Sequence, residues 1–121
     1  MYELVSYWTK EAKVEVSGYS GLDPKPKRFW VMDKLSEFFT LDAEEYADMD
    51  IMLVYCSGHG EGVAGNWCFH KDVEMSFDDV IALWNKSIAK RKSKFVLVLD
   101  SCHSGWWVEK AWDLKLPDVI I

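Results

Sequence analysis

The chain has 121 residues, half of them apolar, which is enough for one hydrophobic core but too few for two stable domains. Its 14 basic and 20 acidic residues give a formal charge of −6, which argues against a nucleic acid or an anionic membrane as the main partner. Seven Trp, six Phe and five Tyr exclude a disordered chain, because these side chains bury large areas. We therefore treat residues 1–121 as a single domain.

Cysteine content and the N-terminus indicate the compartment. The three cysteines, Cys56, Cys68 and Cys102, are too few for the disulfide framework of a small secreted protein, and one must stay unpaired. The N-terminus lacks the basic and apolar regions of a signal peptide, and no stretch approaches the roughly 20 apolar residues of a membrane span. We expect a cytoplasmic protein that binds neither membranes nor nucleic acids.

The first half of the chain contains one helical and one strand pattern. The N-terminal region, residues 1–27, predicts no clear element beyond one or two strands within residues 1–17, after which glycines and prolines break the chain. From Phe29 to Phe39, apolar residues recur with the spacing of an amphipathic helix. An acidic connection, residues 42–50, leads into the wholly apolar run 51–56, which is typical of a buried parallel strand.

The second half repeats the alternation of strand and helix. Residues 67–69 predict a short strand or hairpin arm. Ser76 and Asp79 form a capping-box-like start for a helix over residues 77–91, whose basic C-terminal end suits the helix dipole. A second wholly apolar run, residues 95–99, predicts another buried strand.

These two strands and the helix between them form a βαβ unit. A right-handed crossover makes the strands parallel, so their carboxyl ends share one edge of the sheet, where open α/β sheets place their ligand sites. His59 lies three residues past the first predicted strand, and Cys102 lies three residues past the second. We therefore expect the two side chains at matching height on this edge.

A thiol and an imidazole in this arrangement are suited to nucleophilic catalysis. The thiolate is the nucleophile, and a thiol is mostly protonated at neutral pH unless a neighbouring base takes its proton, so His59 is the candidate base for Cys102. Attack on a carbonyl also requires donors for the developing oxyanion. Backbone N–H groups in the turn with Gly58, Gly60 and Gly62 meet that requirement.

Two motifs carry a family resemblance. The segments YCSGHG (residues 55–60) and LDSCHSG (residues 99–105) resemble the His and Cys signatures of the caspase-like (clan CD) cysteine peptidases. They are most similar to those of metacaspases and prokaryotic caspase-like proteins, which carry Ser-Gly-His-Gly and Asp-x-Cys-x-Ser-Gly in this order. The resemblance covers residues 29–121. It implies an α/β fold with an open sheet of mainly parallel strands flanked by helices, incomplete relative to the full domain, with residues 116–121 opening a further strand.

The resemblance also implies roles for individual residues. Cys102 would be the nucleophile and His59 the general acid/base, and the N–H groups of Gly60 and Cys102 would form the oxyanion hole. Asp100 stands two positions before the nucleophile, where metacaspases place the acid that lines the pocket for the residue preceding the scissile bond. The resemblance thus implies a cysteine endopeptidase that cleaves peptides or proteins after Arg or Lys, and not after Asp.

No cofactor is expected, although the acidic residues and the cysteines raise the question of a metal. Several metacaspases are activated by calcium, for which Asp72, Asp78 and Asp79 are the candidates, although the last two are also explained as first-turn acids of a helix. Zinc bound by the cysteines with His59 and His70 is disfavoured, because neither C-x-x-C nor H-x-x-x-H spacing is present.

The alternative function is a catalytically inactive, shortened caspase-like module with an interaction or regulatory role. An open sheet edge beside the C-terminal strand favours a homodimer with either function. Cys56 and Cys68 are expected to be structural thiols, and Trp106, Trp107 and Trp112 to cover the cleft or pack beneath it. The intact His59 and Cys102 pair favours the enzyme.

Overall fold

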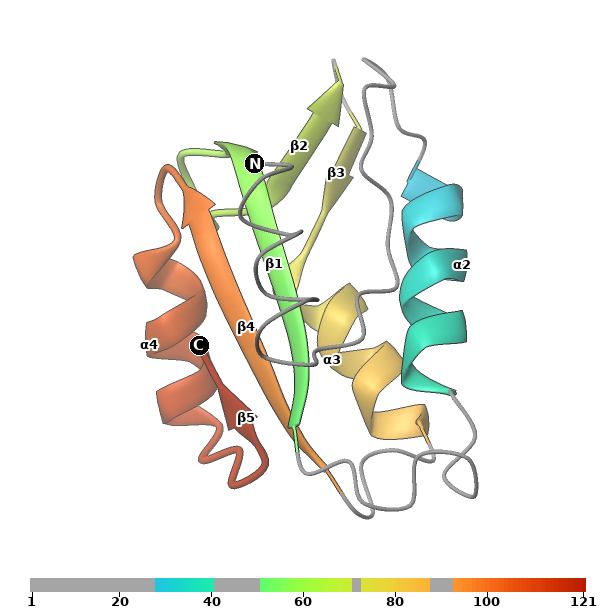
Figure 1. The fold of residues 1–121 in the computed structure, drawn as a ribbon. Coiled ribbons are helices and arrows are strands. Elements are labelled where there is room, and N and C mark those ends of the chain that lie inside the picture. Colours follow the sequence, from blue (N-terminus) through green and yellow to red (C-terminus); the bar gives the residue numbers. More distant parts are fainter. Residues whose placement is uncertain (1–27, 41–50, 71–72, 88–92) are drawn as a thin grey trace, which may run out of the picture.

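The computed structural model describes residues 28–40, 51–70, 73–87 and 93–121, which form a curled sheet with helices packed on it (Figure 1). The helices are α2 (Arg28–Phe39), α3 (Phe77–Lys86) and α4 (Gly105–Asp113). The strands are β1 (Ile51–Gly60), β2 (Trp67–His70), β3 (Val73–Met75), β4 (Lys94–Ser101) and β5 (Val119–Ile120). The predictions for residues 1–27 and 42–50 fall outside the described residues.

The sheet is mixed, with the strand order β3-β2-β1-β4-β5. The α/β class is thereby confirmed, but a mainly parallel sheet is not, because two of the four neighbouring pairs are antiparallel. The parallel pairs, β1 with β4 and β4 with β5, are joined by crossovers that contain α3 and α4. The antiparallel pairs arise because β2 and β3 follow β1 through connections too short for a crossover.

Both central strands are longer than the apolar runs that predicted them. β1 continues beyond Cys56 to Gly60, because β4 pairs with it as far as Gly58 and β2 pairs with its last residues, His59 and Gly60. β4 likewise continues to Ser101. The prediction that His59 and Cys102 each lie three residues past a strand is therefore wrong: His59 lies inside β1, and Cys102 follows β4 directly.

Both predicted helices are present, but the second ends earlier than the predicted residue 91, because Ser87 already has an extended backbone. α2 matches the predicted helix over residues 29–39. α3 begins with the expected capping box, in which the Ser76 side chain accepts a hydrogen bond from the N–H of Asp79 and the Asp79 carboxylate accepts one from the N–H of Ser76. α3 ends at Lys86, and residues 88–92, with most of the basic cluster, lie outside the described part. The strands predicted within 67–69 and 116–121 are β2 and β5.

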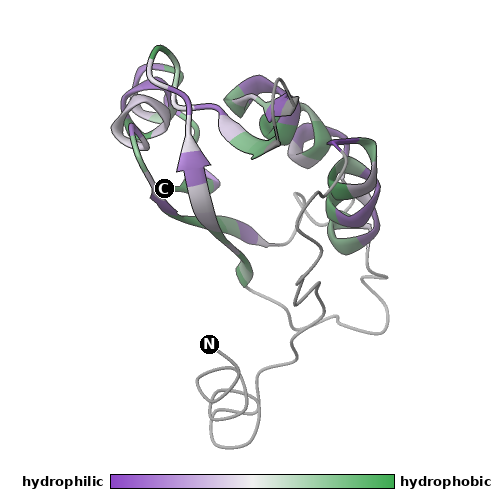
Figure 2. Ribbon diagram, turned by 90° about the horizontal axis from the view of Figure 1, so that it is seen from above, coloured by the Kyte–Doolittle hydropathy of each residue, from purple (hydrophilic) through white to green (hydrophobic). Residues whose placement is uncertain are grey.

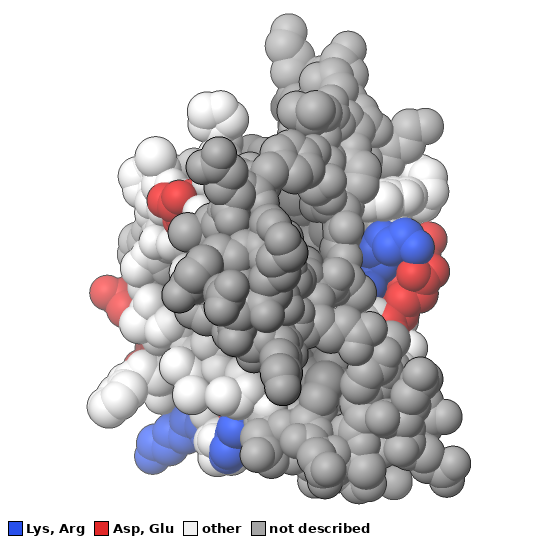
Figure 3. Space-filling model, viewed as in Figure 1, with Lys and Arg blue, Asp and Glu red and all other residues white. Residues whose placement is uncertain are grey.

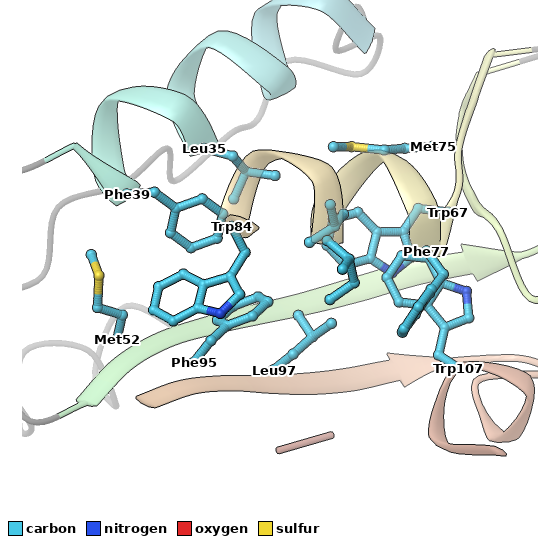
Figure 4. Close-up of a cluster of buried hydrophobic side chains, with 12 residues drawn as sticks. Leu35, Phe39, Met52, Trp67, Met75, Phe77, Trp84, Phe95, Leu97 and Trp107 are labelled. Atoms are coloured by element: carbon cyan, nitrogen blue, oxygen red, sulfur yellow. The ribbon is translucent and has the colours of Figure 1, made fainter. Parts of the chain in front are cut away.

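The core lies between the helices and one face of the sheet, and the three helices share that side (Figure 2). Met52, Phe95 and Leu97 point into it and alternate with exposed or half-buried residues along β1 and β4. Trp84 of α3 is fully buried, with ring centroids 5.4 Å from Phe39 and 5.3 Å from Phe95 (Figure 4). The core thereby connects α2 and α3 to β1 and β4.

The opposite face of the sheet exposes large apolar side chains. They lie on β1, β4 and β5: Ile51, Leu53, Tyr55, Val98 and Ile120. We call this surface the open face. Among the described helices, none is long and apolar enough to cross a membrane.

Ion pairs join the helices at the surface. Arg28 of α2 lies 2.7 Å from Asp79 of α3, and Lys110 of α4 lies 2.8 Å from Asp78. Basic and acidic side chains also adjoin over α2 itself (Figure 3). Burial raises the pKa of Asp79, but hydrogen bonds from Ser76 and the neighbouring Arg28 guanidinium lower it by more, so that it lies below its ordinary value of 3.8.

Asp79→Asn is expected to reduce the free energy of unfolding at pH 7 by about 1 kcal/mol, because it weakens the capping box and removes the ion pair with Arg28. Since the folded-state pKa of Asp79 is depressed, its contribution is complete above the unfolded value and is lost as pH falls through the folded-state pKa. Urea unfolding at pH 7 and pH 3 measures both effects. The control, Asp78→Asn, removes an exposed ion pair and a first-turn acid but leaves the capping box intact, and it should cost only about 0.5 kcal/mol. Equal losses in the two variants would contradict the expectation.

Candidate active site

The structure brings His59 and Cys102 to the same level of two neighbouring strands. The last register pair of β1 and β4 is Gly58 with Ser101, and His59 and Cys102 are the next residue of each segment. Both side chains are exposed. Because side chains alternate along a strand, His59 belongs to the open face, on the side away from the helices. Cys102 lies in the turn directly after β4, so the imidazole and the thiol share one edge of the sheet.

Gly60 of β1 lies against the backbone of the Cys102 turn. A Cβ atom on Gly60 would overlap the carbonyl oxygen of Cys102, so that only glycine fits. The other two glycines of the predicted oxyanion turn do not touch Cys102. Gly58 has nothing within 4 Å of its Cβ position, and the nearest atom to that of Gly62 is Nε2 of His103, at 3.8 Å.

The hairpin between β1 and β2 determines where the Gly60 amide points. The N–H of Glu61 donates to the carbonyl of Asn66 at 2.9 Å, so Glu61 faces β2. Hydrogen-bonding directions alternate along an antiparallel strand, and the N–H of Gly60 therefore points away from β2, toward β4 and the Cys102 turn. This is the direction that an oxyanion donor beside Cys102 requires.

The loop of this hairpin packs on the Cys102 turn. The Glu61 carboxylate accepts hydrogen bonds from the N–H groups of Val63 and Ala64, at 2.6 and 2.8 Å, which order the loop. Gly65 has a positive φ of 67°, and a Cβ there would overlap the carbonyl oxygen of His103. Two close backbone approaches, at Gly60 and Gly65, thus hold β1 and its hairpin loop against the turn that carries the nucleophile candidate.

On its other side, the Cys102 turn continues directly into α4. The N–H of Trp106 donates a hydrogen bond to the carbonyl oxygen of His103 at 3.2 Å. The N–H of Trp107 donates one to the carbonyl oxygen of Ser104 at 3.0 Å. Trp107 is buried and stacks on Trp67 of β2 with ring centroids 4.9 Å apart (Figure 4). Trp107 therefore packs beneath the turn, whereas Trp106 and Trp112 are exposed on α4.

Asp100 lies on the open face beside two hydroxyl groups that the sequence did not single out. The Tyr55 hydroxyl donates to Oδ2 of Asp100 at 3.0 Å, and the Ser57 hydroxyl donates to the same oxygen at 3.3 Å. Ser57 is the direct register partner of Asp100. Strand alternation in the sequence could have indicated these two residues, because Tyr55, Ser57 and His59 occupy the same face of β1.

The remaining cysteines are less suited to be nucleophiles than Cys102. Burial raises the pKa of the Cys56 thiol to about 11. The pKa of Cys68 is also raised, first by burial and then by the carboxylates of Glu74 and Glu61. Both thiols remain protonated at neutral pH and react slowly. Cys102 is the exposed cysteine of the three.

The acidic residues that could bind calcium have other partners. Asp78 and Asp79 form ion pairs with two different cations, Lys110 and Arg28, and Asp72 lies outside the described residues. Within the described ranges, no group of three or more His, Cys, Asp or Glu side chains could hold a metal ion.

Comparisons with protein-family models, with curated proteins and with solved structures found no match to the chain. The assignment of chemistry therefore depends on the geometry of the site itself. An exposed thiol, an imidazole at the same level of the next strand and a backbone N–H directed at the thiol's turn can supply a nucleophile, a base and an oxyanion donor.

Proposed function

We propose that the protein is a caspase-like cysteine endopeptidase that cleaves peptide bonds after Arg or Lys through Cys102 and His59. The observation that carries the proposal is the close approach of Gly60 to the backbone of Cys102. This contact brings the residue after His59 against the backbone of Cys102, which supports the proposal that the two motifs form one site. The motif resemblance supplies the reaction class.

In the proposed reaction, His59 takes the proton of the Cys102 thiol, and the thiolate attacks the scissile carbonyl carbon to form a C–S bond. The N–H groups of Gly60 and Cys102 stabilise the negative oxygen of the tetrahedral intermediate. When the intermediate collapses, the C–N bond breaks and His59 returns the proton to the leaving amine. Water, deprotonated by His59, then hydrolyses the acyl-enzyme and restores the thiol.

Asp100 supports the preference for basic residues. Its carboxylate lies on the open face of β4, two residues before Cys102, where an Arg or Lys side chain of a bound peptide would gain from its charge. An Asp side chain there would be repelled. The formal charge of −6 also favours the approach of basic segments.

Intact-mass labelling tests this function with chloromethyl ketone peptides that differ only in a terminal Arg or Asp. We expect fast formation of a single adduct with the Arg probe, no adduct at this site in Cys102→Ala, and a rate lowered about 100-fold or more in His59→Ala. The Asp probe should react slowly. If the Arg probe labels Cys102 no faster than it labels an unactivated thiol, the enzyme proposal is wrong.

The second candidate function is a non-catalytic interaction module. It is favoured by the apolar residues exposed on the open face, since large exposed apolar patches commonly mark interaction sites. In this case a partner, or a second copy pairing along the outer edge of β5, would cover the same region of the sheet. An unactivated Cys102 in a folded protein is the outcome that selects the module.

A further inference from the structure

We infer that Tyr55 is a positioning residue that sets how the Asp100 carboxylate binds a basic side chain, and thereby how well the site separates Lys from Arg. The inference rests on the proposed function and deepens it. It starts from the hydrogen bond of 3.0 Å between the Tyr55 hydroxyl and Oδ2 of Asp100.

The register explains why a tyrosine reaches this carboxylate. Tyr55 pairs with Val98, and Asp100 is the next residue on the same face of β4. Such diagonal neighbours are within reach of an aromatic side chain. Ser57, directly opposite Asp100, donates to the same oxygen at 3.3 Å. The two hydroxyls approach one oxygen from different strand positions and so restrict the rotation of the carboxylate.

The two carboxylate oxygens are therefore unequal. A carboxylate has roughly four acceptor sites, two on each oxygen, and the hydroxyls of Tyr55 and Ser57 both donate to Oδ2. Within the described part of the chain, no donor lies at hydrogen-bonding distance from Oδ1 of Asp100. A bound basic side chain thus meets Oδ1.

This inequality affects Arg more than Lys. The planar guanidinium gains most when its two N–H groups bind both oxygens of a carboxylate, whereas the ammonium of Lys acts as a point charge and needs only one oxygen. Because two hydroxyls already donate to Oδ2, they compete with an Arg guanidinium for this oxygen and weaken its two-point binding. The exposed Tyr55 ring offers either substrate an apolar surface for its aliphatic stem. The intact site should therefore discriminate weakly between the two.

The test measures the labelling rate of Cys102 by three chloromethyl ketone peptides that are identical except for a terminal Arg, Lys or norleucine. Removing the hydroxyl in Tyr55→Phe frees one acceptor site of Oδ2 and loosens the carboxylate. We expect the rate with the Lys probe to fall about 3- to 10-fold and the rate with the Arg probe to fall less, so that the Arg/Lys ratio rises. The change should appear in the inhibitor dissociation constant and not in the limiting rate.

Val98→Ala is the matched control, because Val98 is the register partner of Tyr55 and is exposed on the same face. It should leave the Arg/Lys ratio unchanged. A ratio in Tyr55→Phe equal to that of the unmodified protein overturns the inference. So does an equal loss with the norleucine probe, which would assign Tyr55 a structural role only.

Failure of the inference is distinguishable from failure of the proposed function. If the unmodified protein prefers both basic probes over norleucine but Tyr55→Phe does not change their ratio, the endopeptidase proposal stands and the role of Tyr55 is rejected. If the unmodified protein does not prefer basic probes, the proposed specificity fails and the inference fails with it. Asp100→Asn, which should remove the preference for both basic probes, identifies the carboxylate as its source.

Discussion

Gly60→Ala is expected to abolish substrate-like labelling of Cys102 and to destabilise the fold. The added Cβ would overlap the carbonyl oxygen of Cys102, and the obstacle is backbone, which cannot turn aside as a flexible side chain can. The end of β1 and the Cys102 turn would have to separate. Forced overpacking costs about 1–3 kcal/mol, and a misplacement of about 1 Å at a reacting group can cost about 100-fold in rate. The labelling rate with the Arg probe and urea unfolding measure the two effects.

Gly58→Ala provides the matched control for this variant. Gly58 lies two residues earlier in the same strand, and its Cβ position has nothing within 4 Å. Alanine there should fold normally and should label at a rate close to that of the unmodified protein. If Gly60→Ala and Gly58→Ala label equally fast, the close approach of Gly60 to Cys102 has no functional meaning, and the main support for the proposed function is lost.

Trp84→Ala should reduce the free energy of unfolding by about 3–5 kcal/mol, a large fraction of the stability of a domain of this size. Trp84 is fully buried between the rings of Phe39 and Phe95, so truncation leaves a large cavity between α2, α3 and β4. It also removes the hydrogen bond of 2.9 Å from the indole Nε1 to Asp118, which anchors the segment leading to β5. Urea unfolding followed by circular dichroism measures the loss.

Trp112→Ala tests whether this loss reflects burial or merely the removal of a tryptophan. Trp112 is 83% exposed on α4, and its truncation should change the free energy of unfolding by no more than about 0.5 kcal/mol. A loss in Trp112→Ala as large as in Trp84→Ala would contradict the described core. Because Trp84 is remote from the Cys102 turn, the folded fraction of Trp84→Ala should still label with the Arg probe.

The elements that the sequence predicted well are those whose signals are local. The capping box of Ser76 and Asp79 requires only residues three apart, and it appears in the structure as expected. The apolar runs 51–56 and 95–99 located β1 and β4. The burial on both faces that a continuous apolar run predicts is wrong, because Ile51, Leu53 and Val98 are exposed on the open face. The ends of both strands were placed too early, since polar residues continue a strand when neighbouring strands supply hydrogen bonds.

The candidate site divides in the same way. The sequence alone predicted the candidate residues His59, Cys102 and Asp100, because the two motifs are defined by residue types and their order along the chain. The motif resemblance already implied that Gly60 lies near Cys102, but only the tertiary structure showed their close backbone approach and joined Tyr55 and Ser57 to Asp100. These contacts depend on the register between β1 and β4, which brings together residues more than 40 positions apart, and no local pattern encodes a register of that range.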